Sequence, residues 1–205
     1  ERTMNTFLGI TATFGAAQVE ERVIADSAYL YIEGYLLSSD SGFEAAVAAQ
    51  QHARAHGTRV ALTLSDPFIV ATFRGRVAKL IECGIDLLFC NDVEARAWTG
   101  RDDLDAALDV LAGQVSRFAV TCGADGARVH DGERLHRVPG FEVKAIDTNG
   151  AGDAFAGAFL YGITHGHDAV RSARLANFAA SRVVSRYGPR LERSFPEDLR
   201  RILQG

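Results

Sequence analysis

Uninterrupted apolar runs separated by helix-like stretches constrain the fold of this chain more than any other sequence feature. The runs occupy residues 28–32 (AYLYI), 59–64 (RVALTL), 85–90 (IDLLFC) and 117–121 (RFAVT). A strand with one solvated face alternates apolar and polar residues, whereas a strand buried on both faces is apolar almost throughout. The runs therefore predict a mostly parallel sheet with helices on both faces, which is the arrangement of a doubly wound α/β domain.

The segments between and after these runs have helical character, with one exception. Helices are predicted at 42–55, 69–83, 93–98, 104–111, 152–165, 168–187 and 196–203. The exception is residues 127–138, where ARVHDGERLHRV alternates and Asp131-Gly132 is a hairpin turn signal, so we expect an antiparallel hairpin there. Because no linker, repeat or low-complexity stretch interrupts the sequence, we interpret residues 1–205 as a single domain.

The composition suits a globular domain and argues against two classes of partner. The 205 residues are 47% hydrophobic and 23% charged, which allows a sizeable core. The net charge of −4 gives no general attraction to nucleic acid or to an anionic membrane, so we expect neither as a partner. A site for phosphate groups must then be built locally, from backbone amides and a few side chains.

Cysteine usage points to a reducing compartment. Cys83, Cys90 and Cys122 form an odd and widely spaced set, and no CxxC pair suggests a structural zinc site. Cys90 and Cys122 lie in or beside apolar runs, so we interpret them as buried free thiols. The expected localisation is therefore cytoplasmic.

Residues 147–153 (DTNGAGD) precede a strongly apolar helix and carry the clearest chemistry in the sequence. Glycines let a ligand approach the main chain. Free amides at the start of a helix, together with the helix dipole, form a site for anions. Asp153 places a carboxylate within that site, and the alternative is that it only caps the helix. A cap needs one oxygen and no glycines, which favours a functional site.

This segment resembles the signature of one enzyme family. The sequence has no GxxxxGK[ST] motif, and Phe155 stands where the dinucleotide-binding fingerprint needs glycine or alanine. DTNGAGDAFAGAFL instead resembles the C-terminal signature of the ribokinase (PfkB) family, D-T-x-G-A-G-D, in the form with Asn149 that is typical of its adenosine kinases.

The resemblance implies specific roles for these residues. Asp153 would be the base that takes the proton from the acceptor hydroxyl, and the amides of Gly150, Ala151 and Gly152 would form an anion hole for the transferring phosphoryl group. Phosphoryl transfer depends mainly on positioning and charge stabilisation, which such a segment can supply.

Residues 91–94 (NDVE) follow the run IDLLFC and resemble the family's N-x-x-E motif. The resemblance implies that Asn91 contacts the nucleotide phosphates and that Glu94 holds Mg²⁺ through water. Open α/β sheets bind ligands at the carboxyl ends of their strands, and Mg²⁺ needs few protein carboxylates. The alternative is that Asn91 or Asp92 caps the following helix.

Two further segments resemble nucleotide-binding parts of the family. Residues 121–126 (TCGADG) are similar to a strand-end turn, which implies that Thr121, Gly123 and Gly126 contact the nucleotide, although an ordinary turn also uses glycine and aspartate. Asn177 resembles a helix position that lines the adenine pocket, although an asparagine in the middle of a helix is more often exposed.

Resemblance extends to a cation loop and to the acceptor side. Asp147 and Gly188 resemble parts of the family's monovalent-cation loop, which implies a K⁺ site. YIEGYLL (31–37) and TLSDPF (63–68) resemble adenosine-kinase segments, and Glu33 matches a position that contacts the sugar. The alternative for Glu33 is a strand-end charge that faces solvent.

Members of the family also carry an N-terminal portion with a glycine-rich substrate segment and a small β-lid. Residues 1–10 (ERTMNTFLGI) resemble the strand that returns from that lid. We therefore expect that the N-terminal substrate and lid portion is absent, and that the chain binds nucleotide but is inactive alone. A chain supplying the missing portion is an expected partner, and a homodimer is the alternative.

Together these features predict an ATP-dependent phosphotransferase that moves the γ-phosphoryl group of ATP to a hydroxyl of a nucleoside, with adenosine favoured, or of a sugar. ATP and Mg²⁺ are the expected cofactors. The alternatives are a sugar kinase similar to ribokinase or fructokinase, an inactive nucleotide-binding fragment, and a different α/β enzyme with an accidental match.

Overall fold

The computed structural model describes residues 9–191 and Ile202. The helix predicted at 196–203 lies outside the described residues except for Ile202. The strand expected at 1–10 also lies outside them, apart from its last two residues, which begin a 3₁₀-helix, η1 (Gly9–Thr13). By its internal contacts the chain divides into two compact units, Glu1–Asp86 and Leu87–Gly205, and each is described by itself. The single domain over residues 1–205 stays a prediction.

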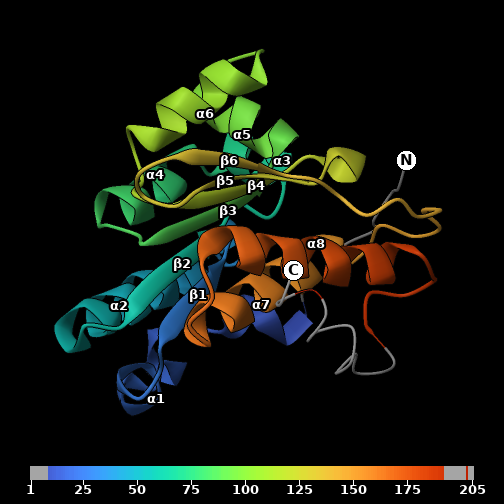
Figure 1. The fold of residues 1–205 in the computed structure, drawn as a ribbon. Coiled ribbons are helices and arrows are strands. Elements are labelled where there is room, and N and C mark those ends of the chain that lie inside the picture. The colour runs from blue at the N-terminus through green and yellow to red at the C-terminus, as the bar shows by residue number, and fades with distance from the viewer. Residues whose placement is uncertain (1–8, 192–201, 203–205) are drawn as a thin grey trace. The chain divides into compact units, whose positions relative to one another are not determined.

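The first unit contains a parallel strand pair joined by a long helix (Figure 1). β1 (Tyr29–Glu33) pairs in parallel with β2 (Arg59–Thr63). α2 (Asp40–His56) connects the strands and packs against both. The interior of β2 is fully buried, as the apolar run predicts. The smaller elements of this unit are η2 (Ala16–Gln18), α1 (Glu21–Ala25), η3 (Gly34–Ser38), α3 (Pro67–Thr72) and α4 (Arg74–Glu82).

Caps and a buried polar anchor explain why α2 forms where the sequence predicts it. Ser39 Oγ accepts a hydrogen bond from the amide of Gly42 at 3.0 Å, and Gly57 ends the helix with φ 72°. The buried side chain of Gln50 donates through Nε2 to the carbonyl oxygens of Leu80 (2.9 Å) and Gly84 (2.8 Å). These two bonds fasten α2 to the end of α4. The face around Gln50 is lined by the buried alanines Ala45, Ala46, Ala49 and Ala53.

The single helix predicted at 69–83 is wrong, because the segment forms two helices. α3 begins two residues earlier since Asp66 caps it, with Oδ1 accepting from the amide of Phe68 at 2.7 Å. Phe73 (φ −113°, ψ 29°) leaves the helical region and separates α3 from α4. The Phe73 ring packs edge-to-face with Phe68, and the guanidinium of Arg76 lies 5.3 Å from its centroid. The periodicity of the sequence does not encode these contacts.

A strained turn follows β2. Ser65 has φ 68° and is the one non-glycine residue with positive φ in the described part of the chain. The amide of Asp66 donates to the carbonyl oxygen of Leu64 at 2.8 Å, so Ser65 is the centre of a γ-turn of the rare, strained form. Ser65 Oγ accepts a hydrogen bond from the amide of Gly34 at 2.9 Å. Gly34, the first residue after β1, therefore stabilises the strained turn that follows β2.

The second unit contains a parallel pair extended by an antiparallel hairpin. β3 (Leu87–Asn91) pairs in parallel with β4 (Phe118–Thr121). β4 pairs antiparallel with β5 (Ala127–His130), and β5 with β6 (Leu135–Val138), which confirms the predicted hairpin. Asp131 closes the hairpin by accepting from the amides of Arg134 and Glu133, and these bonds hold the pKa of its carboxyl well below the ordinary value.

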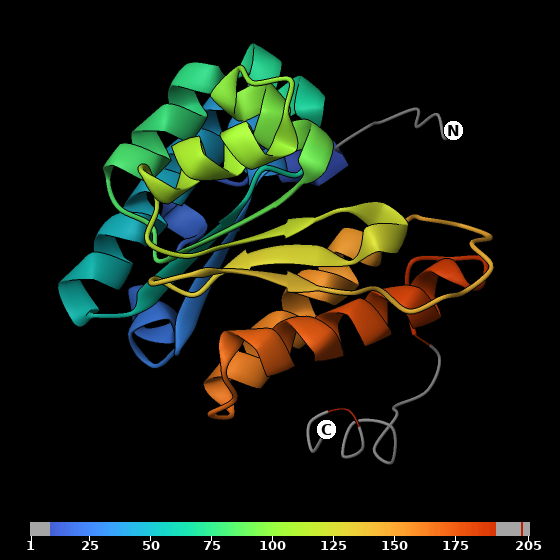
Figure 2. The same ribbon diagram turned by 45° about the horizontal axis from the view of Figure 1, so that its top comes forward.

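Helices cover this sheet on both faces, as predicted for an α/β fold (Figure 2). α7 (Ala151–Thr164) and α8 (Ala169–Val184) lie on one face, and α5 (Asp92–Thr99) and α6 (Leu104–Ala112) lie on the other. Phe89 of β3 packs edge-to-face against Phe155 and Phe159 of α7, with centroid distances of 6.4 and 5.6 Å. These rings fix α7 on its side of the sheet.

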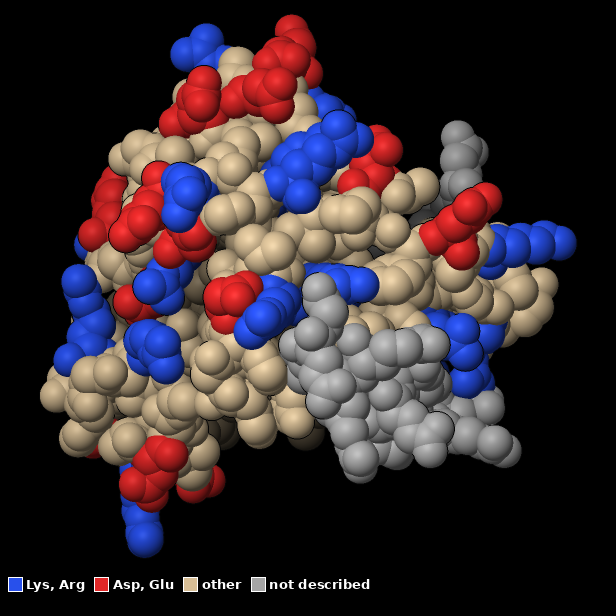
Figure 3. Space-filling view, in the orientation of Figure 1, with Lys and Arg blue, Asp and Glu red and all other residues tan. Residues whose placement is uncertain are grey.

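The surface of the second unit carries an acidic region. Acidic side chains gather over α6 in Figure 3, and the sequence places Asp102, Asp103, Asp105 and Asp109 there.

None of the described helices is long and apolar enough to cross a membrane.

We expect Ser65→Ala to lower the free energy of unfolding by about 1–3 kcal/mol, because the amide of Gly34 loses its acceptor while the positive φ remains. Ser65→Gly loses the same acceptor but relieves a left-handed strain of about 1–2 kcal/mol, so it should be the more stable of the two variants. Denaturant unfolding measures both. Ser38→Ala is the control, since its hydroxyl bonds only to an exposed turn. An alanine variant at Ser65 as stable as the wild type would contradict this account.

Candidate active site

The start of α7 has the geometry of an anion site. Gly150 is the N-cap residue and has a left-handed conformation (φ 76°, ψ 1°). Among the described residues, no acceptor is hydrogen-bonded to the amides of Gly152 and Asp153. Two donors at the positive end of a 14-residue helix therefore remain for a ligand.

Asp153 does not cap this helix. It is the third residue of α7, its side chain is exposed, and no described residue donates a hydrogen bond to its carboxylate. The N-cap position belongs to Gly150, which has no side chain to serve as a cap. The geometry therefore leaves an accessible carboxylate beside two unpaired amides, rather than the simple cap that was the alternative.

Asp147 joins the loop before α7 to the chain after α8. Its Oδ1 accepts from the amide of Asn149 at 2.9 Å, and its Oδ2 accepts from the amide of Gly188 at 3.0 Å. A Cβ on Gly150 would lie 2.5 Å from the carbonyl oxygen of Pro189, so the two segments are in close contact there as well. The structure thus brings together Asp147 and Gly188, the pair that the sequence assigns to one loop.

Asn91 and Glu94 form a reciprocal capping box at the start of α5. Asn91 Oδ1 accepts from the amide of Glu94 at 2.7 Å, while the Asn91 amide donates to Glu94 Oε2 at 3.0 Å. Asn91 Nδ2 also donates to Glu94 Oε1 at 2.7 Å. The capping alternative is therefore present in the structure. Glu94 is only 4% exposed, and these donors and the start of the helix stabilise its buried carboxylate.

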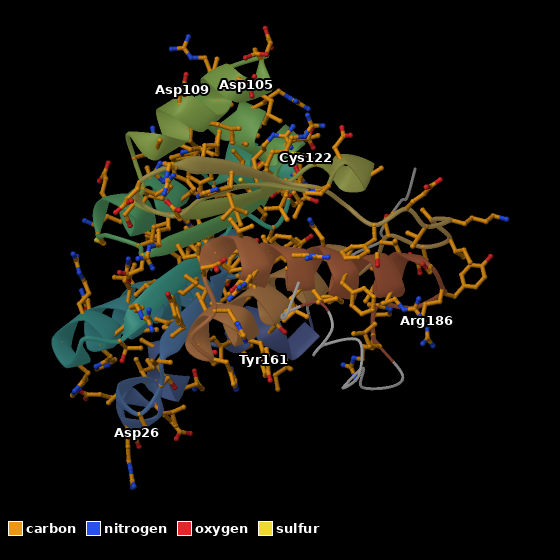
Figure 4. All side chains as sticks on the ribbon, viewed as in Figure 1. Asp26, Asp105, Asp109, Cys122, Tyr161 and Arg186 are labelled. Atoms are coloured by element: carbon orange, nitrogen blue, oxygen red, sulfur yellow. The ribbon has the colours of Figure 1, made fainter. Side chains whose placement is uncertain are left out.

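The carboxyl ends of β3 and β4 bring two of the predicted nucleotide contacts side by side. Asn91 is opposite Thr121 in the parallel register. Beyond Thr121 the chain enters a 3₁₀-turn, η4 (Gly123–Asp125), in which the amide of Cys122 donates to the carbonyl oxygen of Gly126 at 2.8 Å. Figure 4 labels Cys122 at this end of the sheet.

The two glycines of this turn have different surroundings. A Cβ on Gly126 would lie 2.2 Å from the carbonyl oxygen of Val138 and 2.4 Å from the amide nitrogen of Gly140. A Cβ on Gly123 would meet nothing within 4 Å. Gly123 therefore has open space in which a ligand could approach, whereas the chain after β6 fills the space beside Gly126.

Asn177 is buried in α8, at 6% exposure, so the exposed alternative is wrong. Its Nδ2 donates to the carbonyl oxygens of Val138 (3.1 Å) and Pro139 (3.0 Å). Both amide hydrogens therefore hold the segment after β6, which leads directly into Gly140 and its contact with the η4 turn. Asn177 therefore backs this turn, and its place in an adenine pocket stays a prediction.

The sequence did not single out Gly140 and Pro189, although both shape the site. Gly140 backs the η4 turn and Pro189 backs the N-cap of α7. Their dipeptides, Pro139-Gly140 and Gly188-Pro189, mark turns. These dipeptides predict a turn, but they do not predict which distant segment packs against it.

The cysteines are free, as expected, but their burial differs from the prediction. Cys90 is buried, and burial followed by the nearby Glu94 raises the pKa of its thiol well above the ordinary value. Cys122 is only partly buried, which corrects the expectation for that residue. It lies past the end of β4, where the strand no longer covers it.

Glu33, the predicted sugar contact, belongs to the first unit, where it is exposed at the end of β1 opposite Thr63. The described residues contain no group of three or more His, Cys, Asp or Glu side chains that could hold a metal ion. A metal in this site would therefore rely on few carboxylates, which fits Mg²⁺ with its retained waters.

Comparison with known proteins gives consistent matches. The family model for pfkB family carbohydrate kinases matches residues 1–195. Adenosine kinase 1 of Arabidopsis thaliana is 29% identical over 181 residues, which cover 81% of this chain and 52% of that protein.

Two solved structures superpose closely. The adenosine kinase of Sinorhizobium meliloti is 36% identical, with a TM-score of 0.89 over 93% of this chain and 59% of that one. A probable sugar kinase of Rhizobium etli is 34% identical, with a TM-score of 0.89 over 93% of this chain and 58% of that one. The chain therefore spans less than two thirds of the length of each of these proteins.

We expect Gly126→Ala to be far more damaging to stability than Gly123→Ala. Both residues have positive φ, so each substitution adds a left-handed strain of about 1–2 kcal/mol. Only at Gly126 does the new methyl group meet backbone atoms, which adds an overpacking cost of about 1–3 kcal/mol. Thermal and denaturant unfolding of the matched pair measures the difference. Similar losses in both variants would show that the contact with the chain after β6 is not tight.

Proposed function

This chain belongs to the pfkB family of carbohydrate kinases, and we propose that the protein transfers the γ-phosphoryl group of ATP to a hydroxyl group of a small molecule. The observation that carries the proposal is the start of α7, where an accessible carboxylate stands beside two unpaired amides. Phosphoryl transfer needs mainly positioning and charge stabilisation, and this arrangement offers both.

Asp153 is the proposed base. A base must reach the proton of the acceptor hydroxyl, and the Asp153 carboxylate is exposed with no described donor attached to it. The amides at Gly150, Ala151 and Gly152 are the proposed anion hole for the transferring group. No described residue accepts from the amide of Gly152, whereas that of Ala151 makes a long hydrogen bond of 3.3 Å to the carbonyl oxygen of Thr148, which a phosphoryl oxygen would replace. Gly150 is held against Pro189, so the position of the hole is set before any ligand binds.

The carboxyl ends of β3 and β4 are the proposed nucleotide side. Asn91 and Thr121 are neighbours there, and Gly123 leaves open space beside them. ATP supplies the phosphoryl group when bound with Mg²⁺. Glu94 would hold the waters of that ion through the acceptor capacity left on its carboxylate, whose orientation Asn91 fixes. Gly126 and Asn177 are further proposed nucleotide contacts on this side, and their contacts with the chain around Pro139 fix their positions.

The proposed K⁺ site lies where the loop before α7 meets the chain after α8, at the hydrogen bond between Asp147 and Gly188. Its backbone carbonyl groups and the Asp147 carboxylate are oxygen ligands, and they lie next to the N-cap of α7. A cation there would strengthen the positive field at the anion hole.

The proposed acceptor is a nucleoside, adenosine before others, with a sugar as the alternative. The similar proteins named above include adenosine kinases and a probable sugar kinase, so the likeness supports a hydroxyl acceptor more firmly than a particular one. The form DTN at 147–149 and the segments around Glu33 favour the nucleoside.

In a form of the protein that is active, Asp153→Asn should lower turnover by about 10²–10⁴-fold and leave the affinity for ATP–Mg²⁺ unchanged, because it removes the base and keeps the shape of the site. A coupled kinase assay and calorimetry measure the two quantities. Asp105→Asn is the matched control, since Asp105 is also an acidic residue in the first turn of a helix. Full turnover in the Asp153 variant would remove this residue from the mechanism.

A phosphotransfer assay over adenosine, other nucleosides, ribose and fructose tests the acceptor. For an active form we expect the highest kcat/KM with adenosine, because the described segments resemble adenosine kinases. Preference for a free sugar would favour the sugar-kinase alternative. Binding of ATP–Mg²⁺ without turnover on any acceptor would identify a nucleotide-binding chain that is inactive alone, and no nucleotide binding at all would contradict the proposed function.

A further inference from the structure

The β5–β6 hairpin places two arginines directly opposite each other. The antiparallel register pairs Arg128 with Arg137. Like charges directly opposite on one face of a sheet are destabilising. The neighbouring pair, Ala127 with Val138, is buried and lies on the other face because side chains alternate along a strand. The arginine pair therefore occupies the more open face of the hairpin.

Arg128 has no acceptor for part of its guanidinium group. Its Nη1 is shielded from solvent and has no hydrogen-bond partner. In the described part of the chain, no acidic side chain lies within ion-pair distance of Arg128 or Arg137. A shielded donor without an acceptor, and a cation without a counter-charge, are both unfavourable in a folded protein.

The acidic groups nearby do not neutralise this pair. The charged side chains that act on the neighbouring Cys122 are Arg128, Asp92, Asp125 and Arg96. Arg96 already forms an ion pair with Asp92 within α5. Asp125 remains, but it lies beyond ion-pair distance of Arg128.

Protection of a sheet edge does not account for Arg128. Charged side chains on an outer strand discourage pairing with other chains, and that purpose explains the exposed Arg137 on β6. Arg128 lies on β5, which is paired on both sides, by β4 and by β6. Its partly buried guanidinium needs another explanation.

The arginine pair is separate from the candidate active site. Arg128 is opposite Val120 of β4, whereas Val129 is opposite Ala119, which is in turn opposite Phe89 of β3. Phe89 is the residue that packs against α7. The helix that carries Asp153 therefore lies on the other face of the sheet from the arginine pair.

We propose that Arg128 and Arg137 form a second ligand site, which binds an oxyanion of the phosphate class. A phosphate group has several oxygens and can accept from two guanidinium groups at once, in the paired geometry that arginine favours. Such a ligand would supply both the missing acceptor of Arg128 Nη1 and the missing counter-charge of the pair. The same chemistry is offered by free inorganic phosphate and by a phosphate monoester of a larger molecule.

The test follows the side-chain Nε–H resonances of the arginines in the full chain by NMR, during titration with inorganic phosphate. The backbone amide resonances of Gly152 and Asp153 are followed in the same titration, so that binding at the start of α7 is separated from binding at the hairpin. We expect a saturable shift of Arg128 and Arg137 whose midpoint differs from that of these amides. Arg128→Gln and Arg137→Gln should each weaken this binding by about tenfold or more.

Arg101→Gln is the matched control, since it removes one exposed positive charge outside the hairpin. An equal loss of phosphate affinity in this control, or the absence of a saturable shift in the wild type, would overturn the proposal. In phosphate-free buffer, Arg128→Gln or Arg137→Gln should raise the unfolding midpoint by relieving repulsion. Phosphate should then stabilise the wild type but neither variant, and equal stabilisation of all three would also overturn it.

A second titration with adenosine 5′-monophosphate, followed at the same arginine resonances, distinguishes the two sources of phosphate. Tighter binding than that of inorganic phosphate at the same two resonances would identify a phosphate monoester as the ligand, and weaker binding would identify the free anion. A failure of ATP–Mg²⁺ to bind would count against the proposed kinase function alone, because the arginine resonances report the hairpin site independently.

Discussion

The carboxylate of Asp147 is the interaction on which the candidate active site depends. It accepts from the amides of Asn149 and Gly188, and it therefore joins the loop before α7 to the chain after α8. Gly150 lies between these segments, in contact with Pro189, and takes the left-handed conformation that begins α7. The unpaired amides at the start of this helix are thus held by tertiary contacts, and not by helix propensity alone.

The nucleotide side shows how structural and functional roles can fall on the same residues. Asn91 and Glu94 cap α5 through reciprocal hydrogen bonds, and Asn177 holds the segment that backs the η4 turn. Groups already fixed by hydrogen bonds lose less conformational freedom when a ligand binds. The capping box is therefore compatible with the proposed binding role of Asn91 and Glu94, because it orients their side chains in advance.

The sheet of the second unit separates two kinds of surface by the alternation of its side chains. Residues on the side of Phe89 face α7 and include Thr121, at the candidate nucleotide side. Ala127 is the cross-strand neighbour of Thr121, and the next residue, Arg128, lies on the opposite side of the sheet with its own partner Arg137. A shift of one position thus decides whether a side chain belongs to the proposed kinase site or to the proposed oxyanion site.

The sequence by itself determined the strands, most of the helices, the hairpin at 127–138 and the helix that starts within DTNGAGD, because local patterns of apolar residues, glycines and caps specify these elements. Only the tertiary structure decided the break at Phe73, the burial of Asn177, the backing of Gly126 by Gly140, and the pairing of Arg128 with Arg137. Each of these depends on contacts or register between different segments, and a local pattern cannot specify which residues of another segment will lie opposite.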